Sequence, residues 1–446
     1  MALTDLLVES TYSERVKAFP ARGPDLITFS SLGSAIIGLL ATAVTGSMID
    51  RFGPASCYLL AVPFAASIMW PALRNFLGEE AGPRQGTCWL DLEKWRGKGR
   101  VPFFLALVLG VVVISLAFFS MYATSVKHKF YAAILAGTIN LLMCSVLLRP
   151  SIAKINAFFF LQCVFHFNTH GATFYFFTDD EVQFPDGPHF SATFYVTVIG
   201  LVGSLFQLVG IVCYNSFLKS WRYRAVVLIG SLTHSAIQCL SAVVYLRWNV
   251  KLHVPDALFM LASTATQTAI AQLSWMPVSV MLAQLVPDGL ESTLRAVLSS
   301  SMGLGYIVAN YAGAFLLEVL GVSPCGAEAE GDKFAGLWVA AVISACSPCI
   351  PLLLVNHLIP DCRQTDKLLT EGDPASATVG SIFEQWCGKS RDGYLEHDAM
   401  DDRAEGHDDE TNHTSEHQTA SSPASSDVAE EQARMLGKSW GALDLA

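Results

Sequence analysis

Ten apolar stretches, between 19 and 30 residues long, divide this chain. The hydrocarbon core of a bilayer is about 30 Å thick, and a helix rises about 1.5 Å per residue, so about 20 apolar residues span it. Backbone groups in hydrocarbon must bond to one another, and a helix achieves this within a single segment. The sequence therefore predicts an all-α polytopic membrane bundle of about ten transmembrane helices, over residues 26–49, 54–73, 102–123, 130–148, 153–178, 192–216, 223–246, 257–286, 293–320 and 334–358.

The charged residues support a membrane protein, because they make up 15% of the chain, against about 25% in soluble proteins. The net charge of −11 arises near the C-terminal end, where residues 371–446 hold 17 acidic and 5 basic side chains and so carry −12. This segment has too few apolar residues to bury a core. We predict that residues 361–446 form an acidic, disordered cytoplasmic tail.

The orientation in the membrane follows from the lysines and arginines between the spans. Sixteen of them fall on the side that holds both termini, and six fall on the other side. Since basic residues favour the cytoplasmic side, we predict that both termini are cytoplasmic. No signal peptide is recognisable. The membrane itself, plasma membrane or organelle, stays open.

Enzyme and metal motifs are missing from the sequence. It has no GxSxG, HExxH or glycine-rich phosphate loop, so we predict no enzyme activity, no metal, no cofactor and no nucleic-acid partner. The cysteines fall mostly in apolar runs, where they pack as small hydrophobic side chains. Even the CxxC of Cys346 and Cys349 lies in such a run.

The run at 153–180 is apolar enough to span a bilayer, yet it carries polar side chains along its length. Such groups persist mainly where they face a bundle interior or a wet cavity. At about 100° per helical residue, they divide into two stripes. An alternative is that they serve only helix packing and the helix end. One stripe contains Gln162, His166, Thr169, Thr173 and Asp180, and the other contains Asn168, Gly171, Tyr175 and Asp179.

Two long motifs carry a family resemblance. They are GATFYFFTDD at 171–180 and GPHFSATFYVTVIGLVGSLFQLVGIVCYNSFLKSWRYR at 187–224. They resemble the folate-biopterin transporter family, a branch of the major facilitator superfamily, and the similarity covers residues 150–370 densely. The extra pair of spans between 102 and 148, with SWRYR and PDCRQTD, is most similar to protozoan members. The match continues through Gln272, Trp275–Pro277, Pro287–Thr293, Leu320–Val322, Leu337–Trp338 and Ile359–Asp361.

The resemblance implies a transporter of folate, biopterin or related pteridines that works by alternating access between two six-helix halves. Residues 1–25 resemble the cytoplasmic end of a fourth helix and its loop, so the N-terminal half is expected to be incomplete. Residues 26–148 then hold the rest of that half and two extra helices, and 149–360 form the C-terminal six-helix half. The alternative is a truncated, non-transporting paralogue that acts as an interaction or regulatory partner.

Two further helices offer binding groups for a pteridine. The run 257–286 places Trp275 in line with Thr264 and Thr268, beside Gln272. An indole face stacks on a pterin ring, and an amide matches its pyrimidine edge. The alternative is that these side chains are core or interhelical contacts.

The run 293–320 has a polar stripe that begins with Arg295. A guanidinium matches a carboxylate bidentately, so Arg295 is a candidate for the glutamate moiety of folate. The alternative is an intrahelical pair with Glu291, four residues earlier, and the family usually has an apolar residue at this position. The stripe contains Arg295, Ser299, Met302, Tyr306, Asn310 and Gly313.

The family motif favours Tyr175, Thr178 and Asp179, since Asp179 aligns with the polar residue that closes FYFxT. Coupling to protons needs a group that titrates near neutral pH when buried, as a carboxyl or an imidazole can. Asp179, His166 and His170 are the coupling candidates, which would make the protein a proton symporter.

Overall fold

The computed structural model describes residues 2–53, 55–67, 69–74, 100–191, 193–286, 291–366 and 368. Of the predicted tail at 361–446, residues 361–366 and 368 are described and the rest lies outside these ranges. Within these ranges the chain is helical, and the only β-bridge is an isolated one between Arg222 and Arg363. The prediction of an all-α membrane bundle is confirmed.

The N-terminal part of the chain forms helices up to residue 147. Gly53 directly follows the helix that ends at Phe52. Its φ of 77° is the left-handed conformation that glycine adopts readily. The elements are α1 (Ala2–Ala18), η1 (Pro20–Arg22), α2 (Gly23–Phe52), α3 (Ala55–Ser67), α4 (Met69–Leu73), α6 (Arg100–Tyr122) and α7 (Val126–Leu147).

The remaining elements follow from residue 150, where proline occupies the first turn of a helix, as it prefers. They are α8 (Pro150–Val164), α9 (His170–Thr178), η2 (Phe194–Val198), α10 (Ile199–Cys213), η3 (Tyr214–Leu218), α11 (Tyr223–Cys239), α12 (Ser241–Tyr245), α13 (Trp248–Lys251), α14 (Asp256–Gln284), α15 (Glu291–Val319), η4 (Gly331–Phe334), α16 (Leu337–Cys346), η5 (Ser347–Cys349), η6 (Pro351–Leu354) and α17 (Val355–Leu358).

Seven helices of the described part are long and apolar enough to cross a membrane, so this is an integral multi-pass membrane protein. Of the other predicted spans, 153–178 is divided into two shorter helices, and 257–286 corresponds to the single helix α14. Within 54–73 the described residues form α3 and α4, and residues 54 and 68 lie outside the described part. The number of about ten spans stays a prediction. The seven are Pro20–Thr45, Val101–Tyr122, Val126–Leu147, Phe194–Leu218, Tyr223–Tyr245, Ser292–Val319 and Gly331–Leu358.

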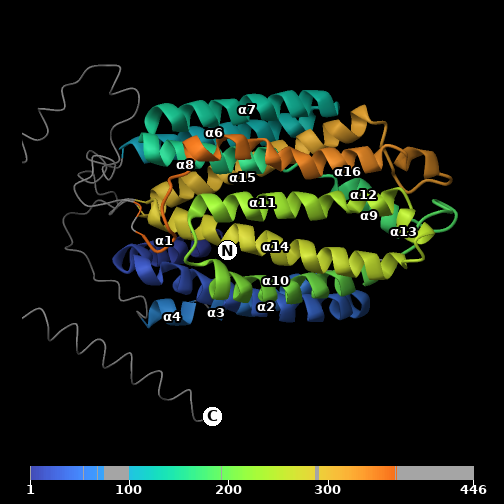
Figure 1. Cartoon of the computed structure of the whole chain (residues 1–446), viewed down its shortest axis with the longest axis horizontal. Coiled ribbons are helices and arrows are strands. Elements are labelled where there is room, and N and C mark those ends of the chain that lie inside the picture. The colour runs from blue at the N-terminus through green and yellow to red at the C-terminus, as the bar shows by residue number, and fades with distance from the viewer. Residues whose placement is uncertain are drawn as a thin grey trace, which may run out of the picture. The chain divides into compact units, whose positions relative to one another are not determined.

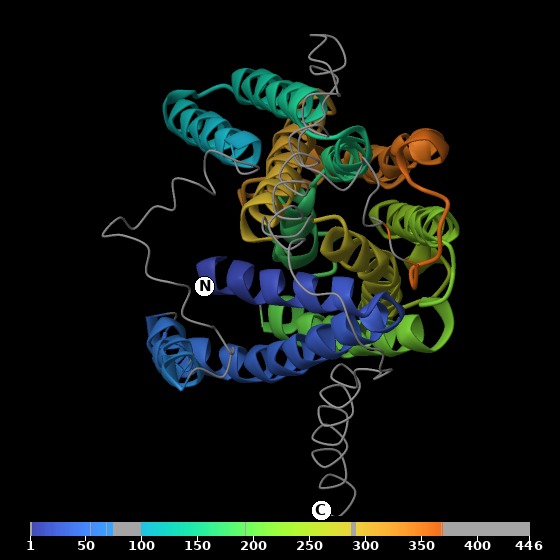
Figure 2. The same cartoon turned by 90° about the vertical axis from the view of Figure 1, so that its left-hand side faces the viewer.

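The long helices lie side by side, with α6 and α7 along one edge and α2 and α3 along the other (Figure 1). Between these edges α10 packs on α14 and α2, and α15 packs on α7 and α8. The first helix, α1, contacts α2, α14 and α15, and Figure 2 shows it lying between α2 and the last two of these. Residues 2–18 are therefore an integral part of the packing.

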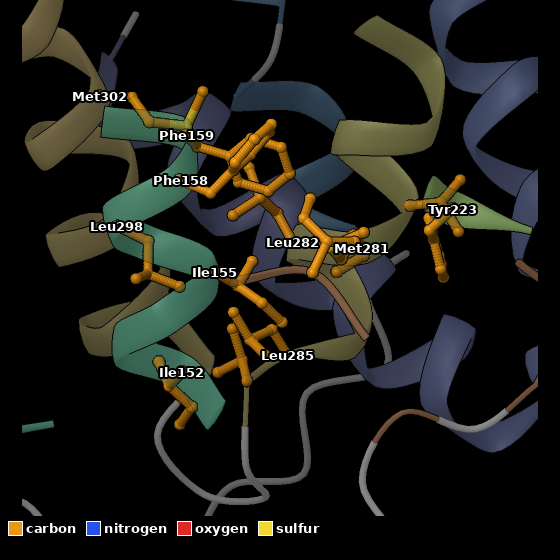
Figure 3. Close-up of a cluster of buried hydrophobic side chains, with 14 of the residues drawn as sticks. Ile152, Ile155, Phe158, Phe159, Tyr223, Met281, Leu282, Leu285, Leu298 and Met302 are labelled. Carbon is orange, nitrogen blue, oxygen red and sulfur yellow. The ribbon is translucent and has the colours of Figure 1, made fainter. Parts of the chain in front are cut away.

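The largest core lies where α8, α14 and α15 meet (Figure 3). Phe158 and Met281 there are completely buried. A second, aromatic core surrounds Phe176 and Phe177 of α9, with Phe184 from the following loop and Phe334 from η4. Large side chains on the outside, such as Phe104 and Tyr122 of α6, are exposed, as expected for helices whose outer faces meet lipid tails.

The prediction of one continuous helix over 153–178 is wrong, because α8 ends at Val164 and α9 begins at His170. The serines of α16 and η5 make the interruption possible: Ser347 and Ser344 donate hydrogen bonds to the carbonyls of Phe165 and Phe167. Irregular backbone at membrane depth is tolerated where protein satisfies it in this way. The two stripes calculated for a regular helix therefore do not exist as such.

The SWRYR and PDCRQTD motifs lie together at the end of the bundle where α8 begins. Arg222 pairs with Asp361 at 2.9 Å, and the amide of Tyr223 donates to the carbonyl of Cys362 at 3.1 Å. Gln364 is completely buried, and its carbonyl accepts a bond from Gln284 at 3.2 Å. The segment after the last helix is thus fastened over α11 and α14.

Candidate functional site

A polar face follows α15 through the middle of its length. Ser299, Gly303, Tyr306 and Asn310 recur at helical spacing, and all of them are exposed. Polar side chains on a spanning helix face protein or water and avoid lipid. The predicted stripe is therefore partly right, but Arg295, Met302 and Gly313 are buried.

The polar face of α15 meets the interruption between α8 and α9. Asn168 donates to the Oδ1 of Asn310 at 2.8 Å, and its own Oδ1 accepts from the amide of His170, also at 2.8 Å. Gly313 allows this contact, because a Cβ at that position would lie 2.0 Å from the Asn168 carbonyl oxygen. Asn168 was predicted on one of the two polar stripes, but it was not among the residues that the family motif favoured.

His166 meets a second imidazole that the sequence interpretation missed. Its ring centre lies 5.8 Å from that of His234 on α11. The Nδ1 of His234 and the Oε1 of Gln162 are buried and have no hydrogen-bond partner among the described residues. The His166–His234 pair can accept a polar ligand or water. Only the tertiary contact, between residues 68 positions apart in the sequence, brings the two imidazoles together.

Tyr175 and Thr178 are structural in part. The hydroxyl of Thr178 bonds to the Phe174 carbonyl at 2.8 Å, and the ring of Tyr175 stands edge-on to that of Phe174 at 5.9 Å. Neither side chain is fully buried.

Asp179 follows α9 and is 4% exposed. Its Oδ2 is buried without a hydrogen-bond partner among the described residues. Burial, together with the nearby Glu330 and Asp180 carboxyls, raises the pKa of Asp179 above its ordinary value. A carboxyl of this kind can hold a proton that an exposed one would release.

Glu330 shows the opposite behaviour on the neighbouring loop. It is 1% exposed, and burial alone would raise its pKa. Its carboxylate accepts bonds from the amides of Cys325 and Gly326, at 2.9 Å and 3.0 Å, and from Lys333 at 2.8 Å. The Cys325 thiol also donates to this carboxylate at 2.9 Å. The thiol bond first, then the bonds from Lys333 and the backbone amides, hold the pKa of Glu330 well below its usual range. Glu330 therefore remains a charged neighbour of Asp179.

On α14, Gln272 and Trp275 have different surroundings. Gln272 is buried and accepts a long bond of 3.4 Å from Gln207 on α10. Thr264 and Thr268 also face α10, where both lie against Gly203. Trp275 is 42% exposed. The helix-packing alternative thus fits Gln272 and the threonines, whereas the indole of Trp275 is partly exposed.

Arg295 lies near the start of α15 and is 7% exposed. Its Nε donates to the Oε2 of Glu9 on α1 at 3.0 Å. The side chain of Glu291 lies outside the described residues, so the predicted pair with Glu291 stays a prediction. Glu9 was missed because nothing in the sequence links residue 9 to residue 295.

The selected residues do not converge on one pocket. Asn310 and Arg295 are 15 residues apart on α15, which corresponds to about 22 Å along the helix. Asp179 follows α9 and lies near the loop that holds Glu330. Arg295 lies near the start of α15, where it contacts Glu9 of α1. A cavity of about 290 Å³ between α7 and α15 is lined only by apolar side chains, including Phe130, Phe165 and Phe315. It offers no group for a pteridine edge. The described residues contain no cluster that could hold a metal ion.

Comparison with known proteins identifies the family. A family model described as "BT1 family" matches residues 1–379. The chain belongs to the BT1 family. No solved structure matches this BT1 chain.

Curated relatives of the BT1 chain are named as transporters. It is 28% identical to the probable folate-biopterin transporter 6 of Arabidopsis thaliana, over 51% of this chain and 42% of that protein. It is 25% identical to the probable folate-biopterin transporter 2 of the same plant, over 83% and 63%. With the folate-biopterin transporter of Synechocystis sp. the identity is 28%, over 46% and 38%. The chain spans about half the length of these relatives.

Proposed function

We propose that this BT1 chain carries folate, biopterin or a related pteridine across a membrane by alternating access. One observation supports this most strongly: the polar face of α15, with Ser299, Tyr306 and Asn310, is exposed within a helix apolar enough to span a bilayer. Such a face suits a water-filled path. In this proposal, the N-terminal segment up to residue 148 rocks against the bundle formed by residues 149–360.

The pteridine ring would stack on Tyr306 or Trp275, which are 45% and 42% exposed. Asn310 and Asn168 would bond to its pyrimidine edge, since each amide offers a donor and an acceptor. Arg295, nearer the start of α15, would receive a carboxylate. The path then uses groups at successive depths of the bundle.

Proton coupling is the finer part of the proposal. Asp179 would take up and release the proton, because burial and nearby carboxyls raise its pKa above its ordinary value. His166 and His170 are the further candidates, and His166 lies beside His234. This makes the protein a symporter whose uptake depends on pH.

The test is uptake of radiolabelled folate and biopterin by a pteridine-requiring host that expresses the chain. We expect saturable uptake, and we expect Tyr306→Leu to reduce it about 3- to 10-fold, the size of a lost aromatic contact. Tyr122→Leu on α6 is the matched control, because Tyr122 is 82% exposed on the outside of the bundle and should not matter. Expression in the membrane without uptake or binding would favour the alternative, a non-transporting interaction or regulatory partner.

A further inference from the structure

The cavity between α7 and α15 has no role in the proposed transport path. Its volume is about 290 Å³, and only apolar side chains line it. Of these side chains, Val308 and Ala312 are buried, whereas Ile134 and Val319 are 40% and 64% exposed. The cavity therefore extends from the packed interior to the outer surface of the bundle, which lipid tails cover.

The lining of the cavity favours a hydrocarbon occupant. A buried water needs about two to four polar partners, and this lining offers none. In other proteins an apolar cavity of about 150 Å³ stays dry and accepts benzene. A cavity of about 290 Å³ at the lipid surface therefore suits a segment of an acyl chain, whose dispersion contacts fill the space.

A positive charge lies on the same face of α7 as the cavity. Phe130 and Ile134 line the cavity, and Lys127 precedes them by three and seven residues, the spacing of one helical face. Lys127 is exposed and forms no ion pair among the described residues, not even with Glu318 in the last turn of α15. The first turn of α7 has no acidic side chain, and Ser125 makes no side-chain capping bond. An anion is favoured at such a helix start.

We propose that this cavity binds one acyl chain of a phospholipid with a net negative headgroup. The chain fills the apolar space between α7 and α15, and the headgroup phosphate lies at Lys127 and the first amides of α7. The aliphatic stem of the lysine covers the chain where it leaves the cavity. This inference does not depend on the proposed transport function.

The bound chain supports the interruption between α8 and α9. Phe165 and Phe167 line the cavity, and their carbonyls accept the bonds from the two serines. Asn168, the next residue, bonds to Asn310 on the polar face of α15. A lipid in the cavity thus contacts the irregular backbone beside the candidate site. Filling an otherwise empty space should stabilise the fold.

The test uses the purified full chain in phosphatidylcholine nanodiscs that contain a small fraction of phosphatidylglycerol with a photoactivatable diazirine in its acyl chain. Mass spectrometry then maps the labelled peptides. We expect labelling on α7 within 130–134 and on α15 within 308–319. Unlabelled phosphatidylglycerol should compete about fivefold better than phosphatidylethanolamine, the effect of one lysine near an anionic headgroup. Lys127→Gln should remove this preference.

Matched variants separate the cavity from the general lipid surface. Ile134→Trp places a large ring at the exposed edge of the cavity and should remove the labelling at these positions. Leu135→Trp is its control, because Leu135 is 62% exposed and does not line the cavity. Lys251→Gln, which changes an exposed lysine of α13, is the control for Lys127→Gln. Phosphatidylglycerol should also raise the thermal unfolding midpoint of the unaltered chain and of Leu135→Trp, but not that of Ile134→Trp.

The outcomes decide each part of the proposal. Labelling that Ile134→Trp removes and that prefers phosphatidylglycerol through Lys127 supports it, whether or not the chain carries a pteridine. Labelling that is equal on the outer face of α6, or that Ile134→Trp leaves unchanged, would overturn the cavity as the site. Equal competition by phosphatidylethanolamine would overturn the anionic headgroup. Stronger competition by cholesterol than by phosphatidylglycerol would assign the cavity to a sterol and overturn the phospholipid.

Discussion

At the scale of single residues, the two buried carboxyls near the end of α9 differ because their partners differ. Glu330 accepts hydrogen bonds from two backbone amides and from a lysine, whereas the Oδ2 of Asp179 has no partner among the described residues. Burial is common to both. The hydrogen bonds decide which of them stays ionised.

The raised pKa of Asp179 has a consequence for stability. The protonated carboxyl is the favoured form in the fold, so its contribution is complete below the ordinary carboxyl pKa and is lost as the pH rises through the raised value. Asp179→Asn keeps a neutral side chain at every pH. We expect its thermal unfolding midpoint to exceed that of the unaltered chain at pH 8 and to approach it at pH 4.

The control for this measurement is Asp186→Asn in the same loop, whose side chain is exposed. Its profile should follow that of the unaltered chain. The same Asp179→Asn variant should also lose the pH dependence of pteridine uptake. If its uptake keeps the original pH dependence, Asp179 is not the coupling group.

At the scale of helices, the interruption between α8 and α9 depends on close packing against α15. A Cβ on Gly313 would lie 2.0 Å from the Asn168 carbonyl oxygen, and the neighbouring backbone cannot yield as a flexible side chain can. We expect Gly313→Ala to destabilise the protein by about 1–3 kcal/mol or more. The measurement is its thermal unfolding in detergent.

Gly303 on the same helix is the matched control, because nothing lies within 4 Å of a Cβ built there. Gly303→Ala should be neutral or stabilising by less than about 1 kcal/mol, as alanine favours helix. Equal behaviour of the two variants would contradict the packing described for residues 165–169.

The serines that satisfy the interruption lead to a third prediction. Replacing both Ser344 and Ser347 by alanine leaves the carbonyls of Phe165 and Phe167 without their donors. An unsatisfied buried acceptor costs about 1–3 kcal/mol. The double variant should unfold at a lower temperature than Ser279→Ala, whose hydroxyl bonds only within its own helix. A midpoint no lower than that of the control would show that water replaces the serines.

The sequence predicted the long helices well because length and apolar character determine them. It did not predict the interruption at 165–169, since that depends on Ser344 and Ser347 nearly 180 residues later. The family motif selected Asp179, and the structure explains its unusual environment through Glu330, on a loop that no local pattern connects to it. The same holds for Glu9 beside Arg295, and for His234 beside His166. Local patterns found one partner of each pair, and tertiary packing supplied the other.

At the scale of the whole molecule, each end of the bundle is closed by different contacts. The loops around residues 183 and 330 bond to each other at one end, through Gln183 and Glu330 at 2.8 Å. Ion pairs hold the other end, including Glu9 with Arg295 and Arg222 with Asp361. The charge distribution predicts that the second end is cytoplasmic.

Labelling of thiols tests this orientation. Cys325 is exposed in the loop with Glu330, so a membrane-impermeant maleimide should label it in intact cells of a host that carries the chain in its plasma membrane. Cys325→Ser should abolish that labelling. Labelling of Cys325 only after the membrane is permeabilised would show that the orientation is reversed.

The most direct measurement for the central claim is uptake by proteoliposomes that contain only this purified chain. The account predicts saturable accumulation of labelled folate, competed by unlabelled folate and reduced about 3- to 10-fold by Tyr306→Leu but not by Tyr122→Leu. Folded, membrane-inserted protein that accumulates neither folate nor biopterin would contradict it.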